Sequence, residues 1–277
     1  MAARRLCLIG VCSLTLSACL STSTIIRVAP DGSGTVEQTL MFNAKAVESA
    51  FAGMGFKPSG SKSTSSVQKS PIDEASMKQA AETLGNGVTL VSVTPVKEPS
   101  GFEGVTARFR FDDITKLNTR DFLMPGPAAQ EMSSGGAKDR IAFDLRRAPG
   151  GTSILTATFA EEPGKSSSGK SSKGAKGGPG LDDPEVRQMV KALFKGFRIG
   201  VDLEIIGQIV QTDADYVNGK RITLAEIDIE QLLLEGKKLE SLDKIISPDA
   251  SIAEVRPYLK DVKGLKINRP VLTVEFR

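Results

Sequence analysis

The sequence predicts an α+β fold with a mainly antiparallel sheet built of hairpins, several packed helices and one long disordered Gly/Ser/Lys insertion. Three observations predict it. Segments of alternating apolar and polar residues recur, as expected for half-buried antiparallel strands. Glycine-containing turns join these segments in pairs. Amphipathic stretches with helical spacing lie between the pairs, without the strand–helix–strand rhythm of a parallel sheet.

A hairpin is predicted at the start of the folded part. Its strands cover residues 24–30 and 35–42, where apolar side chains recur at alternate positions. The link Asp31-Gly32-Ser33-Gly34 supplies two glycines that can adopt positive φ. A helix at 44–54 is predicted next, because Asn43 is a good N-cap.

The middle of the chain is expected to alternate between loops, a helix and strands. Residues 57–71 are rich in Ser and Lys and are predicted to be loop. A helix at 72–84 is favoured by Pro71 before its start and Gly85 after its end. Strands are predicted at 88–96, 105–112, 140–147 and 152–159, with a long connection at 113–137.

The segment 163–180 contains almost only Gly, Ser and Lys. It has too little apolar area to fold, so it is expected to be a disordered insertion within a single domain spanning 24–277. Four lysines make it cationic: Lys165, Lys170, Lys173 and Lys176. We interpret it as a solvated linker, with contact to anionic lipid head groups as the alternative.

The last third is expected to contain most of the helices. A single apolar stripe predicts a helix at 183–195. A long strand at 198–217, bent near Gly207, is predicted to turn at Asn218-Gly219 into a partner strand at 220–227. Helices are then predicted at 229–235, 238–246 and 251–259, with a closing strand at 272–276.

The first twenty residues carry the most specific motif. Arg4 and Arg5 precede an apolar run at 6–16 that is too short to span a bilayer as a helix. The run ends in Leu16-Ser17-Ala18-Cys19, which resembles the lipobox of bacterial lipoproteins. The resemblance implies a signal peptide at 1–18, cleavage between Ala18 and Cys19, and a diacylglycerol on the Cys19 thiol, often with a third acyl chain such as palmitate on the new amine.

The same resemblance implies an address in the cell. Residues 19–23 would form a lipidated tether that holds the protein to a membrane, since two or three acyl chains give a stable anchor. In Gram-negative lipoproteins, Asp after the cysteine retains the protein in the inner membrane. Leu20 stands there instead, which favours the outer membrane, facing the periplasm.

Composition excludes several classes of function. There is no histidine, and Cys7 and Cys12 lie in the predicted signal peptide, which removes Ser-His and Cys-His pairs and His-based zinc sites. The formal net charge of +3 gives no basic field for nucleic acid. We therefore expect no enzyme activity, no metal and no cofactor.

Acidic and basic clusters offer weaker alternatives. Residues 213–219 have acids and a glycine at spacings that depart from a calcium loop, so a strand edge and turn are favoured. Glu226, Asp228 and Glu230 alternate along the chain and could supply a carboxylate pair for glycan hydrolysis. A polar strand face leading into a helix is the favoured interpretation. Arg108 and Arg110 are interpreted as solvated, with an anionic head group as the alternative.

Beyond the lipobox, the hairpin around Asp31-Gly32-Ser33-Gly34, its strand to Phe42 and the Asn218-Gly219 turn resemble mycobacterial LppM-type envelope lipoproteins. The resemblance implies a body that binds membrane lipids or lipoglycans, and no functional residue is carried over. The chain lacks the C-terminal membrane helix associated with that group.

The expected function is that of a non-catalytic, lipid-anchored envelope protein that binds an amphiphile or an envelope protein partner. Two alternatives stay open: a carboxylate-dependent periplasmic glycan hydrolase, and a structural spacer in an envelope assembly. The amphiphile hypothesis predicts an apolar groove or patch in the folded body.

Overall fold

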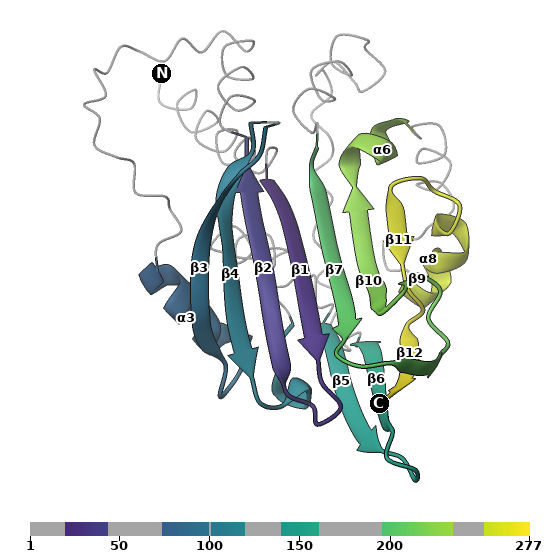
Figure 1. Ribbon diagram of the computed structural model, residues 1–277. Helices are drawn as coiled ribbons and strands as arrows, with labels where there is room; N and C mark the ends of the chain where they lie inside the picture. The colour runs from purple at the N-terminus through teal and green to yellow at the C-terminus, as the bar shows by residue number, and fades with distance from the viewer. Residues whose placement is uncertain (1–19, 44–73, 100, 120–139, 161–195, 235–251) are drawn as a thin grey trace, which may run out of the picture.

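The fold is built from two β-sheets rather than one sheet with many helices (Figure 1). The computed structural model describes residues 20–43, 74–99, 101–119, 140–160, 196–234 and 252–277. Over this part of the chain, strands dominate and only three α-helices are present. The prediction of several packed helices is therefore wrong.

The larger sheet has eight strands and is antiparallel at every described pair but one. In spatial order its strands are β11 (Leu265–Ile267), β10 (Arg221–Asp228), β7 (Arg198–Ile205), β1 (Leu20–Val28), β2 (Gly34–Phe42), β4 (Glu103–Phe111) and β3 (Thr89–Lys97), with β9 (Val217–Asn218) paired to β10. The exception is β1, which lies parallel to β7 although 177 residues separate Ser21 from Arg198. This pairing joins the two halves of the chain across the segment 163–180.

The smaller sheet has four strands, all antiparallel. Their order is β5 (Arg140–Arg147), β6 (Ser153–Ala160), β12 (Val271–Phe276) and β8 (Ile209–Thr212). It lies behind the lower part of the large sheet in Figure 1. In the described ranges the helices are α3 (Glu74–Leu84), α6 (Ile229–Leu234) and α8 (Ile252–Leu259), together with the 3₁₀ turn η2 (Ile114–Lys116).

Among the described residues, the continuous core lies between the two sheets, against the lower half of the large one. Large, fully buried side chains come from both sheets, among them Phe109, Leu203, Leu155 and Phe276. On the large sheet the continuous core ends at the level of Ala107 and Val201. The upper half of the same face, toward the start of β1, lies outside this core.

The predicted long strand at 198–217 is two strands in different sheets. β7 ends at Ile205 in the large sheet, and β8 begins at Ile209 in the small one. Gly207 makes the crossing possible, because its φ is +143° and a Cβ there would lie 2.3 Å from the carbonyl oxygen of Arg277. The bend predicted near Gly207 is therefore the point where the chain passes from the large sheet to the small one.

Most predicted hairpins are confirmed. β1–β2, β5–β6 and β9–β10 pair as expected. The strands predicted at 88–96 and 105–112, for which no pairing was predicted, pair with each other as β3 and β4. In the first turn only Gly32 has positive φ; Gly34 is needed for another reason, since a Cβ there would lie 1.9 Å from the carbonyl oxygen of Arg27. The helices predicted at 44–54, 183–195 and 238–246, and the insertion 163–180, lie outside the described residues.

The first strand begins earlier than predicted. β1 starts at Leu20, which pairs with Phe42, rather than at residue 24. Residues 20–23, which were assigned to a lipidated tether, are thus part of a central strand. The described chain reaches the sheet one residue after Cys19.

Candidate functional site

A row of polar side chains lies on the inner face of the large sheet, just above the core. Thr24 pairs with Gln38 on one side and Val201 on the other, and Gln38 pairs with Ala107. Residues directly opposite each other in paired strands share one face. Thr22, two positions along β1, points to that face as well. We call Thr22, Thr24 and Gln38 the polar row; all three are buried, with exposures of 3%, 1% and 8%.

One member of this row has an unpaired donor. Within the described part of the chain, the amide nitrogen Nε2 of Gln38 is buried and has no hydrogen-bond partner. A buried donor without a partner costs about 1–3 kcal/mol. Such groups are rare in folded proteins, and a bound molecule is one way in which they are satisfied.

Apolar side chains continue from the polar row toward the upper end of the sheet. Thr22 pairs with Leu40 and Ile199, and Leu40 pairs with Val105. Val105 and Ile199 are each 8% exposed and belong to no part of the continuous core. Among the described positions on these two rows of the inner face, none carries an ionisable side chain. These two rows therefore place one unpaired amide donor beside apolar side chains.

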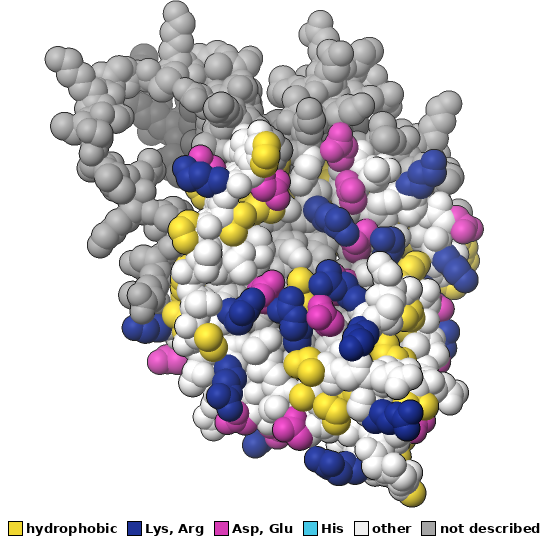
Figure 2. Space-filling view, in the orientation of Figure 1, with side chains coloured by type: hydrophobic (Ala, Val, Ile, Leu, Met, Phe, Trp, Pro, Cys, Tyr) yellow, Lys and Arg dark blue, Asp and Glu magenta, His cyan; other side chains and the backbone are white. Residues whose placement is uncertain are grey.

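The outer face of the same sheet has the opposite character (Figure 2). Charged side chains of both signs alternate across its middle, each beside a partner on the next strand. They form a chain of ion pairs from β4 to β10: Arg108–Glu37 at 2.7 Å, Glu37–Arg27 at 3.1 Å, Arg27–Glu204 at 3.5 Å and Glu204–Arg221 at 2.9 Å. We call this chain the ion ladder.

The ion ladder keeps its acids charged. Burial alone would raise the pKa of the Glu37 carboxyl, but hydrogen bonds and charge from Arg108 and Arg27 together hold that pKa below its ordinary value. The guanidinium of Arg108 is therefore paired with the Glu37 carboxylate. Arg110 lies 3.7 Å from Asp112, with both side chains well exposed. Both arginines therefore have an acidic neighbour. This favours the interpretation of Arg108 and Arg110 as solvated charges over binding of an anionic head group.

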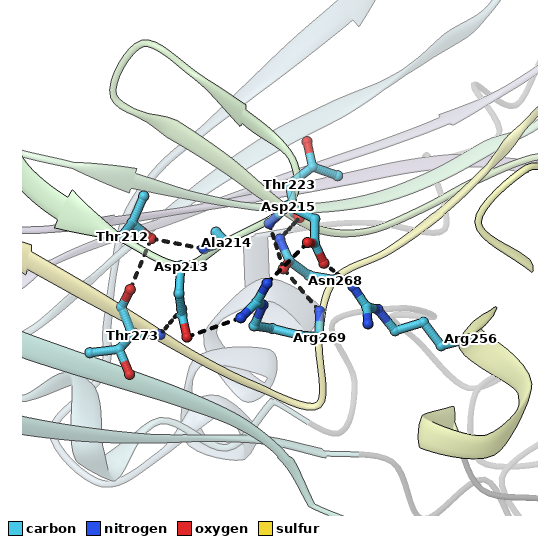
Figure 3. A network of polar contacts seen from close by, with 9 residues as sticks. All are labelled: Thr212, Asp213, Ala214, Asp215, Thr223, Arg256, Asn268, Arg269 and Thr273. Atoms are coloured by element: carbon cyan, nitrogen blue, oxygen red, sulfur yellow. Dashed lines mark hydrogen bonds and ion pairs between the residues drawn. The ribbon is translucent and has the colours of Figure 1, made fainter.

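A second polar cluster ties the strand ends of the small sheet to α8 (Figure 3). Asp213 accepts a hydrogen bond from the backbone nitrogen of Thr273 at 2.7 Å. Arg269 donates to Asp213 at 3.3 Å and to Asp215 at 3.1 Å, and Arg256 also pairs with Asp215. The acids of segment 213–219, whose spacing was compared with a calcium loop, are thus paired with arginines rather than free to bind a cation (Figure 3).

Asn268 is the centre of this cluster and is fully buried. Its Nδ2 donates to the carbonyl of Thr223 at 2.9 Å, and its Oδ1 accepts from the backbone nitrogens of Asp215 at 3.1 Å and Arg269 at 2.9 Å. Burial alone would raise the pKa of the Asp215 carboxyl, but Arg269 and Arg256 outweigh it and lower that pKa. The cluster is a structural junction, because Asn268 and both aspartates are paired within it, although Nε of Arg269 is buried without a hydrogen-bond partner.

The three alternating acids have separate structural partners. Glu226 lies between Arg198 and Lys266, Asp228 accepts from the backbone nitrogen of Gln231 at the start of α6, and Glu230 accepts from the backbone nitrogen of Gly196. Burial would raise the pKa of Glu226, but the two cations lower it overall. A general acid for glycan hydrolysis needs a raised pKa, so Glu226 has the wrong shift for that role.

Several predicted site residues lie outside the described residues: Ala18, Cys19, Lys165, Lys170, Lys173 and Lys176. Lipidation, cleavage and lysine contacts therefore stay predictions. In the described ranges, no three His, Cys, Asp or Glu side chains are grouped so that they could hold a metal ion. None of the helices there has the length and apolarity to cross a membrane.

Sequence reasoning missed the polar row, although a signal was present. In β1, Thr22 and Thr24 fall in phase with the buried Ile26 and Val28, and in β2 Gln38 falls in phase with Val36. Polar residues at positions that the period of two assigns to the core are the sign of a special site.

Comparisons with known proteins give little. No family model matches the chain, and no curated protein matches it. A solved structure, the NMR structure of the folded domain of the Mycobacterium tuberculosis LppM protein, is similar at 12% identity and a TM-score of 0.31, over 93% of this chain and 89% of that one. The hairpin resemblance and this match thus name the same protein group, but the likeness is faint and no property is carried from it.

Proposed function

We propose that this protein is a non-catalytic, lipid-anchored protein of the bacterial cell envelope that binds a neutral amphiphile on the upper inner face of its large sheet. The observation that carries the binding proposal is the buried, unpaired amide nitrogen of Gln38. The anchor proposal is supported by the lipobox ending at Cys19.

The chemistry of the polar row selects the ligand class. The Nε2 group of Gln38 is a donor, so it requires an acceptor such as an ester, amide or hydroxyl oxygen. A charged group placed beside this row would lose its hydration without gaining a counter-ion, which is costly. Lipid esters and acylated amides, which carry an uncharged acceptor between apolar chains, fit both conditions.

The flanking residues favour a long apolar molecule. Leu40, Val105 and Ile199 extend the row toward the end of the sheet where β1 begins. Burial of acyl chains on such a surface contributes about 25 cal/mol per Å² of apolar area. The apolar contacts would supply affinity, and the polar row would fix the position of the acceptor.

The four lysines between residues 165 and 176 are proposed to contact anionic head groups of the anchoring membrane. Each lysine at an anionic surface contributes up to about 1 kcal/mol. They assist the anchor and are separate from the proposed amphiphile site.

The test is mass spectrometry of lipids that co-purify with the mature protein, comparing wild type with Gln38→Met. This change removes the amide and keeps the side-chain length. We expect at least a tenfold loss of bound neutral lipid, with an unchanged circular dichroism spectrum. Gln211→Met, the same change at an exposed glutamine of β8, is the matched control and should retain the lipid.

Two results would count against the proposal. Equal amounts of lipid on wild type and Gln38→Met would show that the Gln38 amide does not contribute to lipid binding. A mature protein that carries no lipid on Cys19 and stays in the soluble fraction would remove the anchor.

A further inference from the structure

We infer that the upper edge of the large sheet faces the anchoring membrane, so that its strands stand roughly upright on the bilayer with the sheet's lower end directed away. This inference rests on the proposed anchor at Cys19. It concerns the surface that meets the lipid, which neither the lipobox nor the amphiphile proposal specifies.

Very little chain separates the proposed anchor from the sheet. Leu20, the residue after Cys19, is already paired with Phe42 in β1. Adjacent Cα atoms are 3.8 Å apart, so the lipidated residue and the sheet are separated by a single peptide unit. A long flexible tether would allow any orientation, whereas a single peptide unit limits how far the start of β1 can move from the lipidated residue.

The position of β1 then decides which surface approaches the bilayer. β1 is a central strand, with β2 and β4 on one side and β7 and β10 on the other. Its first residues lie level with the end of β2 and the starts of β4 and β7: Phe42 pairs with Leu20 and Glu103, and Ser21 Oγ donates to the carbonyl of Arg198 at 3.2 Å. An anchor attached at this point pulls the whole edge toward the membrane.

The opposite edge is far away. β4 runs from Glu103 at the upper edge to Phe111 at the lower edge. Its eight steps of about 3.3–3.4 Å span about 27 Å. The turn around Gly32 and residue Asp112 are therefore held away from the lipid surface.

Charge does not set this orientation. The described cations near the upper edge are matched by acids, with Lys97 at 3.1 Å from Glu103 and Arg198 paired with Glu226. Attraction to anionic head groups by this edge is therefore small. The covalent anchor is the cause, and the orientation should persist when salt screens the surface.

The arrangement also gives the proposed amphiphile site a direction. The apolar residues above the polar row lie between Gln38 and the membrane-facing edge. A lipid could then pass between bilayer and site without crossing the aqueous phase.

The test uses spin labels and the natural lack of other thiols. After loss of Cys7 and Cys12 with the signal peptide, Cys19 is the one cysteine of the mature chain and its thiol is alkylated. Lys97→Cys at the upper edge and Asp112→Cys at the lower edge each give one label site, and these side chains are 73% and 80% exposed. The lipidated proteins are placed in phosphatidylethanolamine/phosphatidylglycerol vesicles that carry Ni²⁺ on chelating lipids.

We expect relaxation of the label by Ni²⁺ to be several-fold stronger at position 97 than at position 112. The difference should persist in about 1 M salt, where the Debye length is about 3 Å. A flexible Gly/Ser linker inserted between Cys19 and Leu20 should reduce the difference while the protein stays on the vesicles.

Equal relaxation at both positions, or a stronger effect at 112, would overturn the orientation. The anchor is judged separately, because Cys19→Ala must release the protein from the vesicles if the anchor exists. A protein that is anchored but not oriented contradicts only this inference, whereas a protein that is not anchored contradicts the proposed function itself.

Discussion

Two buried side-chain amides, Asn268 and Gln38, illustrate opposite uses of the same chemical group. The amide of Asn268 donates to one backbone carbonyl and accepts from two backbone nitrogens, and it joins segments from three parts of the chain. The amide nitrogen of Gln38, among the described residues, donates to nothing. The first amide is fully paired within the fold, whereas the nitrogen of the second has no partner among the described residues.

The two amides therefore differ in how much their hydrogen bonds contribute to the stability of the fold. Both ends of the Asn268 amide are bonded to the backbone, so a change at Asn268 removes hydrogen bonds that the fold uses. The amide nitrogen of Gln38 makes no hydrogen bond among the described residues, so its removal takes away the cost of an unpaired buried donor. Each prediction below tests one side of this contrast.

The largest effect is expected from Asn268→Leu. It removes three hydrogen bonds and leaves the carbonyl of Thr223 and two backbone nitrogens without their partner. At about 1 kcal/mol each, the loss in free energy of unfolding should be about 3 kcal/mol. Urea unfolding followed by circular dichroism measures it. A loss below about 1 kcal/mol would show that the Asn268 amide is not paired as described.

The next largest effect is expected from Asp215→Asn. The carboxylate pairs with Arg269 and Arg256, and its side chain is 19% exposed. An amide keeps the shape but loses the charge, so the free energy of unfolding should fall by about 1–2 kcal/mol. Asp144→Asn is the control, since the Asp144 side chain is 55% exposed and forms one surface pair with Arg146. Equal losses from the two variants would contradict the prediction.

The free energy of unfolding should fall in acid, because several paired carboxylates lose their charge there. The pKa values of Glu37, Asp215 and Glu226 are lowered in the folded protein. A lowered pKa contributes stability that is complete above the unfolded value of about 4 and is lost as the pH falls through the folded value. Unfolding free energy measured from pH 6 to pH 2 should therefore drop below about pH 4. In Asp215→Asn this drop should be smaller, and an identical acid limb would argue against the role of Asp215.

The smallest effect on stability is expected from Gln38→Met in the protein freed of lipid. Removing an unpaired buried donor should leave the free energy of unfolding within about 1 kcal/mol of wild type, or raise it. The same urea measurement applies. A loss of about 3 kcal/mol, similar to that expected for Asn268→Leu, would mean that the Gln38 amide is part of the fold, and the contrast would collapse.

The hairpins were predictable because their signals are local. Gly32, Gly85 and Gly219 adopt positive φ where the sequence placed turns or a helix end. The alternation of Val105, Ala107, Phe109 and Phe111 matches the buried face of β4. Local glycine chemistry and a period of two therefore located most strand pairs.

The arrangement of the sheets was not predictable in the same way. The parallel pairing of β1 with β7 joins residues far apart in the sequence, and nothing local marks it. Gly207 looked like a bend within one strand, because a residue that permits a bend also permits a change of sheet. Tertiary contacts decide between those outcomes, so the two-sheet fold and the small helical share were missed.

Only part of the candidate site could be predicted from the sequence. The in-phase positions of Thr22, Thr24 and Gln38 were visible, but the inner face could be identified only after the partners of β1 were known. The acids and arginines singled out in the sequence proved to have structural partners elsewhere in the fold, as Arg108 has in Glu37 and Glu226 has in Arg198. Charged residues attract attention in a sequence, whereas an uncharged amide within a strand does not.

The parallel pairing of β1 with β7 also sets an order of events during biogenesis. β1 can form its hairpin with β2 early, but its other edge has no neighbour until the residues near Arg198 have been synthesised. Until then, β1 is a strand with one unpaired edge. Slow delivery of the second half prolongs that exposed state, in which an unpaired edge can add a foreign strand.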